Sequence, residues 1–169
     1  MMMNKVIILL MLSVLFFSCA AEDEPKLTPL SADEISGDRL WQRITEDSDF
    51  NNYRQWSGHE GLRPGQSPHG VLHKVFANRD IYDALPVTTG EVPYGSIIVK
   101  ENYTSTKKID KLTVMAKVKG YSPETNDWFW AMYSPEGEVM AEGSPSGCLS
   151  CHGGLVSNDY IIIKNIDEP

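Results

Sequence analysis

Cys148-Leu149-Ser150-Cys151-His152 is the stretch from which the rest of this chain can be interpreted. Its C-x-x-C-H spacing is typical of c-type haem attachment, in which two cysteines bond one porphyrin and the adjacent histidine ligates the iron. Two intervening residues let both sulfurs reach the two vinyl positions while the imidazole lies beneath the metal. The motif therefore predicts one haem c per chain, attached through Cys148 and Cys151, with His152 as the proximal iron ligand.

Two other uses of a cysteine pair fit this sequence less well. A zinc site needs a second cysteine pair or two histidines at ligand spacing, and the only other cysteine is Cys19, near the start of the chain. A thioredoxin-like dithiol lies between a strand and a helix of a βαβ unit, not at the late position of this pair. Haem is the interpretation that the pattern favours.

Residues 1–18 have the features of an export signal. A short cationic start ending at Lys5 precedes a dozen apolar residues, which are too few to span a bilayer. Phe17-Ser18-Cys19 resembles a lipoprotein site with Cys19 as the acylated first residue, and small-x-small cleavage around Ser18 is the alternative. We expect a lipoprotein-type signal peptide over 1–18, an acidic tether over 19–31 and one haem c domain over 32–169.

The predicted location is extracytoplasmic, in a bacterial periplasm or cell envelope, with the membrane reached by the lipid anchor only. The formal net charge of −8 becomes −9 once Lys5 leaves with the leader. Such acidity argues against nucleic acid as a partner and against electrostatic binding to anionic lipid. Because lipid or cleavage accounts for Cys19 and haem for the other two cysteines, no disulfide is expected.

The hydrophobic patterns predict an α+β, β-rich fold in which an antiparallel meander is combined with an N-terminal helix and a short C-terminal haem-attachment helix. A capping box at Ser31-Ala32-Asp33-Glu34 predicts a helix over 32–46. A short turn or helix is expected over 78–85, and an irregular loop over 59–70. Alternation and β-branched residues predict strands over 71–77, 96–101, 112–118, 128–133 and 159–163.

Several of these segments together resemble a known family, cytochrome P-460 and its relative cytochrome c′-beta, over roughly residues 40–163. The resemblance implies a β-rich homodimer with a five-coordinate haem c. It implies either oxidation of hydroxylamine or reversible binding of nitric oxide and carbon monoxide, with a soluble cytochrome as redox partner. The matching pieces, in family order, are Tyr53-Arg54-Gln55-Trp56, 95–101, Asp127-Trp128-Phe129-Trp130, the late C-x-x-C-H and Asp159-Tyr160.

The resemblance also assigns residues around the haem. Lys100 matches a lysine that forms an additional covalent bond to the porphyrin edge, although a strand lysine directed to solvent is the alternative. Met115 falls where hydroxylamine-oxidising members carry a proton-relaying glutamate, which favours gas binding because a thioether is not a base. His73 falls near a distal-side arginine, as a proton acceptor or a packing residue, whereas His69 is expected to be structural.

The sixth iron position separates the function classes. No methionine or histidine follows His152, so a distal ligand would come from upstream, and an open position suits gas binding or catalysis. Met115 as a sixth ligand would instead make the protein a plain electron-transfer cytochrome. The upstream residues that could ligate iron are His59, His69, His73, Met115, Met132 and Met140.

Overall fold

The computed structural model describes residues 26–163, so the predicted signal peptide and Cys19 lie outside the described residues. The centre of the fold is a seven-stranded sheet in which every strand pair is antiparallel. Its order is β1-β3-β4-β5-β6-β7, and β2 also pairs with β3. The strands are β1 Arg54–Gln55, β2 Arg63–Pro64, β3 Leu72–Ala77, β4 Ile97–Tyr103, β5 Ile109–Lys117, β6 Trp128–Tyr133 and β7 Val139–Gly143.

The predicted α+β, β-rich meander is confirmed, with two differences at its ends. The four central strands β3 to β6 lie where alternation predicted them, but β7 was not foreseen. The strand predicted over 159–163 is wrong. Asp159 and Tyr160 have φ angles of +49° and +62°, a left-handed conformation that an extended strand cannot contain.

The predicted N-terminal helix starts later than its capping box suggested. Ser31 does donate to the Glu34 carboxylate, but α1 begins at Gly37, where the Ser36 hydroxyl accepts from the Arg39 amide. The helices are α1 Gly37–Gln42, α2 Arg79–Tyr82 and α3 Ser146–His152, with a π turn η1 Arg43–Asp47 and 3₁₀ turns η2 Phe50–Asn52, η3 Pro123–Thr125 and η4 Gly153–Asn158.

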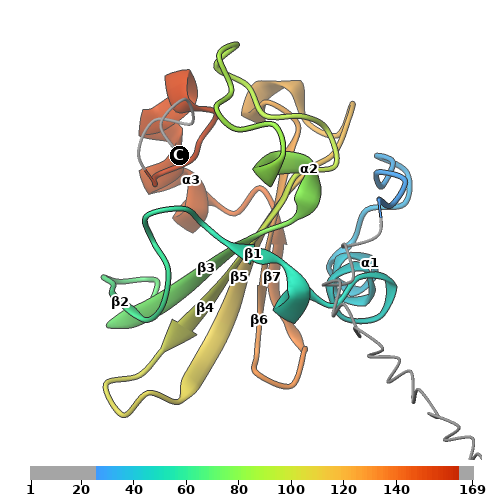
Figure 1. The fold of residues 1–169 in the computed structure, drawn as a ribbon. Helices are drawn as coiled ribbons and strands as arrows, with labels where there is room; N and C mark the ends of the chain where they lie inside the picture. Colours follow the sequence, from blue (N-terminus) through green and yellow to red (C-terminus); the bar gives the residue numbers. More distant parts are fainter. Residues whose placement is uncertain (1–25, 164–169) are drawn as a thin grey trace, which may run out of the picture.

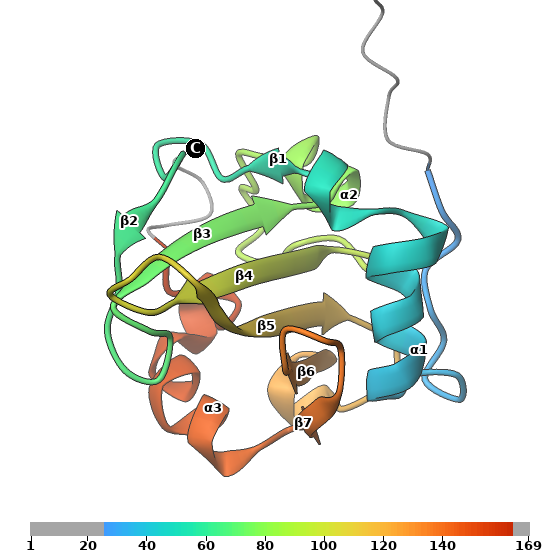
Figure 2. The same cartoon turned by 90° about the horizontal axis from the view of Figure 1, so that it is seen from below.

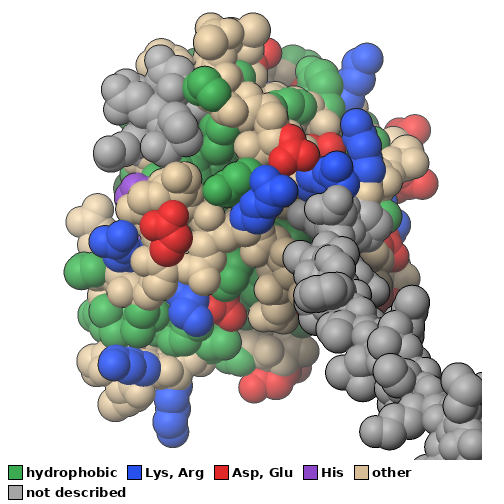
Figure 3. Space-filling model, in the orientation of Figure 1, with side chains coloured by type: hydrophobic (Ala, Val, Ile, Leu, Met, Phe, Trp, Pro, Cys, Tyr) green, Lys and Arg blue, Asp and Glu red, His purple; other side chains and the backbone are tan. Residues whose placement is uncertain are grey.

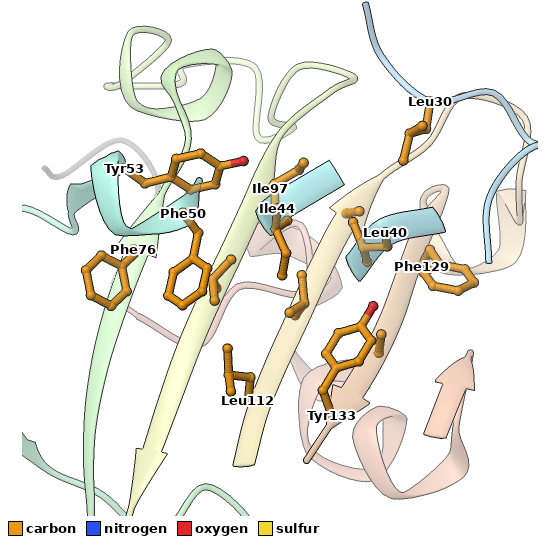
Figure 4. Close-up of a cluster of buried hydrophobic side chains, with 14 of the residues drawn as sticks. Leu30, Leu40, Ile44, Phe50, Tyr53, Phe76, Ile97, Leu112, Phe129 and Tyr133 are labelled. Atoms are coloured by element: carbon orange, nitrogen blue, oxygen red, sulfur yellow. The ribbon is translucent and has the colours of Figure 1, made fainter. Parts of the chain in front are cut away.

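The two faces of the sheet are covered by different parts of the chain. α1 packs on one face, and α3 with η4 lies on the other (Figures 1 and 2). The apolar core fills the α1 side, where aromatic and branched side chains of the helix and the strands interlock (Figure 4). A second cluster, which we call the α3-side cluster, contains among others Trp56, Val75, Ile98, Met115, Trp128, Trp130 and Tyr160.

The surface carries charges of both signs. Basic and acidic side chains are interspersed over the face drawn in Figure 3. Between residues 26 and 163, no helix combines the length and the apolar character needed to cross a membrane.

Candidate haem site

The three motif residues lie together on α3. Cys148, Cys151 and His152 are related by three and four positions, so their side chains point to the same side of the helix. Cys148 is half-buried against the α3-side cluster, Cys151 is exposed, and His152 is 9% exposed. Burial raises the pKa of the Cys148 thiol, which keeps it protonated. The helix thus presents two reduced thiols beside a buried imidazole.

His152 is held in one tautomer. Its Nδ1 lies 2.6 Å from the Tyr160 carbonyl oxygen, which can only accept, so Nδ1 carries the proton and Nε2 has a free lone pair. Burial, and then the positive charge of Lys100, lowers the pKa of His152 against the opposing effect of the Tyr160 hydrogen bond. A neutral imidazole with a protonated Nδ1 and a free Nε2 is the form that binds a metal.

The sheet brings the other predicted residues to the same face. Lys100 lies between Val75 and Thr113 in the strand register. Met115 lies between Ile98 and Trp130 in the next row. His73 is opposite Asn102 on β3. Because side chains of alternate residues share a face, Lys100, Met115 and His73 all point toward the side covered by α3.

Lys100 carries a destabilised charge. It is half-buried, and burial alone lowers the pKa of its amine to about 8. Among the residues that the structure describes, no carboxylate forms an ion pair with it. Its incomplete exposure and its place on the face covered by α3 favour the inward orientation over the solvent-directed one. Its amine is therefore partly unprotonated near neutral pH.

His69, which the sequence favoured as a structural residue, lies beside His152. Its ring centroid lies 6.2 Å from that of His152, and its Nδ1 lies 3.2 Å from the Thr113 hydroxyl. Burial, followed by the charges of Lys100 and His152, lowers the pKa of His69 to about 4. The Pro68-His69-Gly70 turn looked structural, and the signal that could have found it was its place in a long glycine-rich loop.

The loop that carries His69 also closes over His73. A Cβ atom at Gly65 would lie 2.7 Å from the Gly70 carbonyl oxygen and 3.0 Å from the His73 Nδ1, so only glycine fits there. Burial and then the Lys100 charge lower the pKa of His73 to about 4. Two imidazoles with pKa values of about 4, those of His69 and His73, thus lie near the Lys100 amine on one part of the face.

These residues fit a haem. Two buried nitrogen atoms on this side, the His73 Nδ1 and the Trp130 Nε1, have no hydrogen-bond partner within the described residues, which is unusual for buried polar groups. The Trp130 ring lies 6.4 Å from the His152 ring and forms an apolar wall together with Ile98 and Met115. A bound group that is apolar in its centre and polar at its edge would satisfy both features.

A comparison with protein families identifies the group of proteins to which the chain belongs. The family model Cytochrome P460 matches residues 50–163. The chain belongs to the cytochrome P460 family. As a member it is a cytochrome that binds haem. No curated protein is significantly similar to it. The matched segment of this cytochrome begins at η2 and includes all seven strands and α3, whereas α1 precedes it.

Proposed function

We propose that this cytochrome P460 is an exported protein with one haem c per chain, and that its open iron side binds small nitrogenous ligands. The observation that carries the proposal is the arrangement of α3. Cys148 and Cys151 precede a buried His152 on one side of the helix, and the His152 Nδ1 donates to the Tyr160 carbonyl, so that its Nε2 is available to iron. Bound there, haem would supply a redox-active iron with affinity for diatomic and nitrogenous ligands.

Attachment needs no oxidant. Each thiol would add its S–H across one vinyl double bond of the haem, and the thiols of Cys148 and Cys151 are both reduced. The mature protein should retain its haem through acid-acetone extraction. Cys148→Ala with Cys151→Ala should lose covalent haem, whereas Cys19→Ala is the matched control and should keep it. Haem that extracts from the wild type would disprove c-type attachment.

The α3-side face supports gas binding more than multiproton oxidation. Met115 is buried in an apolar cluster beside Trp130, and a thioether offers no base. His69 and His73 are neutral at pH 7 because their pKa values are about 4, so they can accept hydrogen bonds but are weak bases. Nitric oxide and carbon monoxide require no proton transfer to bind. Hydroxylamine oxidation, which releases several protons, should therefore be slow.

The matching experiment compares wild type with Met115→Glu. Hydroxylamine oxidation is assayed with an artificial electron acceptor, and nitric oxide binding is followed by absorption. We expect slow hydroxylamine oxidation by the wild type and faster oxidation by the glutamate variant. Met132→Glu, in the neighbouring row of the same sheet face, is the control. Rapid wild-type turnover with no gain in Met115→Glu would contradict the preference for gas binding.

Absorption of the reduced protein separates the alternatives. A high-spin spectrum with an ordinary Soret band indicates an open gas-binding site. A strongly red-shifted Soret band indicates the oxidising form with a lysine bond, for which Lys100 is our candidate because its amine is inward and its pKa is about 8. An unmodified Lys100 tryptic peptide would exclude that bond. A sharp low-spin band indicates an electron carrier, with Met115 as the sixth ligand.

Export and assembly are separate parts of the proposal. We infer lipidation of Cys19 from its place after an apolar run and before an acidic tether. Intact-mass measurement of membrane-purified protein should find acyl chains on Cys19, and an unmodified start after it would favour simple secretion. Light scattering of the soluble domain should give a homodimer, which the resemblance implies. Its electrons would pass to a soluble partner cytochrome.

A further inference from the structure

A buried ion pair lies behind the segment that contacts His152. Asp159 is 0% exposed and Lys117 is 3% exposed. The Lys117 Nζ donates to both carboxylate oxygens, at 2.7 and 2.6 Å. Three further donors point at the same carboxylate: the Val92 amide at 2.9 Å, the Trp128 Nε1 at 3.1 Å and the Asn126 Nδ2 at 3.2 Å. All the hydrogen-bonding capacity of this carboxylate is thus used to fix its position.

The backbone at this point is in a conformation that needs such support. Asp159 and Tyr160 are consecutive non-glycine residues in the left-handed region, which L-residues disfavour. Besides the carboxylate network, the Tyr160 amide donates to the Leu155 carbonyl at 2.9 Å, and its hydroxyl donates to the Glu124 carbonyl at 3.1 Å. These contacts turn the Tyr160 carbonyl toward α3, where it accepts from His152.

We propose that the Lys117–Asp159 ion pair positions the Tyr160 carbonyl against the His152 Nδ1 and thereby tunes the iron through its proximal ligand. The proposal rests on the proposed function, in which His152 ligates the iron. Lys117 is the last residue of β5 and Trp128 the first of β6, so the carboxylate is tied to the rigid sheet. The sheet, the left-handed turn and the imidazole form one connected chain of contacts.

The expected consequence is electronic. A hydrogen bond from Nδ1–H to a fixed acceptor makes the imidazole a stronger donor to the metal, and stronger donation favours the ferric state. If the turn relaxes, the Tyr160 carbonyl moves away from the His152 Nδ1. The imidazole then becomes a weaker donor to the iron, and the ferrous state becomes more favourable. The ion pair should therefore hold the reduction potential of the haem lower than it would otherwise be.

The test is a double variant, Asp159→Asn with Lys117→Met, which changes no net charge and leaves no unpaired buried ion. Spectroelectrochemistry of the haem-loaded protein should show about a tenfold rise in the ferrous-to-ferric ratio at a fixed applied potential, equivalent to about 59 mV for a one-electron couple. Should the double variant fail to accumulate, Asn126→Gly removes one donor while allowing the left-handed φ that Asn126 adopts. Its expected change is in the same direction, about threefold.

The matched control is Asp127→Asn. Asp127 is another buried carboxylate at a left-handed turn. Its carboxylate accepts hydrogen bonds from Tyr94, Gly120 and Ser122 and makes no contact with Tyr160. It should lose thermal stability without a change in potential. An unchanged potential in the variants, or an equal shift in the control, would overturn the proposal. Failure of the proposed function would look different, because the wild type would then lack covalent haem altogether.

Discussion

The two faces of the sheet are built from the same strands but carry different kinds of side chain. On the α1 side, β4 and β5 contribute Val99 and Val114, which pack against Leu40 and Ile44 in a cluster of buried apolar side chains. On the α3 side, the same strands contribute Lys100, Thr113 and Met115. One face is a conventional core. The other mixes apolar walls with groups that are costly to bury.

The difference teaches where stability and function are separated in this fold. On the α1 side the buried Arg43 forms an ion pair with Asp47, whereas the α3 face keeps a lysine without an ion-pair partner among the described residues. The α3 face also keeps two buried nitrogen atoms, of His73 and Trp130, without hydrogen-bond partners among those residues. Local violations of packing rules concentrate at functional sites. Substitutions on the α1 face should therefore change folding, and those on the α3 face should change haem properties.

The largest effect is expected from Leu40→Ala on the α1 face. Leu40 is 0% exposed, and truncation of such a leucine leaves a cavity as well as losing burial. The free energy of unfolding should fall by about 3 kcal/mol, measured by urea denaturation. The spectrum of the folded fraction should stay that of the wild type. Val71→Ala, at a side chain that is largely exposed, is the control and should cost little. A Soret shift in Leu40→Ala would break the separation of the faces.

The second prediction concerns pH and the α3 face. Burial lowers the pKa of His69 in the folded state to about 4, against 6.5 when unfolded. Because the folded state disfavours the protonated imidazole, the stability that the neutral His69 allows is fully present above pH 6.5. This part of the free energy of unfolding is lost as the pH falls toward 4. At pH 4 the free energy of unfolding should be about 3 kcal/mol lower for this reason. His69→Gln should lack this part of the acid destabilisation, and urea titrations of both proteins at pH 7.5 and pH 4 measure it. Equal losses in the two proteins would show that His69 is not buried as a neutral group.

The third prediction compares two tryptophans of β6. The Trp128 Nε1 donates to both the backbone and the carboxylate of Asp159, whereas the Trp130 Nε1 has no partner within the described chain. Hydrogen bonds to charged groups are worth about 1.5–3 kcal/mol. Trp128→Phe should therefore lower the free energy of unfolding by about 2 kcal/mol more than Trp130→Phe does, as measured by thermal unfolding. Trp130→Phe should instead alter the haem spectrum, because its ring lies beside His152. Equal costs would mean that Trp130 acquires a partner in the haem-loaded protein.

Parts of the fold and the site followed from local pattern. Alternation together with β-branched and aromatic residues predicted the strands β3 to β6, and the strand register then puts Lys100, Ile98 and Asn102 on one face. The C-x-x-C-H motif was readable because its chemistry depends on near neighbours in sequence. The family membership followed from the order of several such pieces and is confirmed.

What failed depended on contacts between distant residues. Asp159 to Ile163 reads as a strand by composition, but the buried bonds from Asp159 to Lys117 and Trp128 hold a left-handed turn instead. His69 approaches His152 only because the loop after β2 folds back over the sheet. Neither contact has a signal in the local sequence, since tertiary interactions override local preference.

The smallest predicted effect tests the start of α1, which anchors the apolar face. The sequence favoured Ser31 as the helix cap because Glu34 follows at capping-box spacing, and those two side chains do bond. In the structure the Arg39 amide donates to the Ser36 hydroxyl at 3.1 Å, and Tyr133 donates to the Gly37 carbonyl from the opposite side of the core. Loss of an N-cap costs about 1 kcal/mol. Ser36→Ala should cost that much in urea denaturation, whereas Ser31→Ala, at an exposed turn, should cost less than about 0.5 kcal/mol. The reverse order would mean that the helix starts at the capping box, five residues earlier than the structure has it.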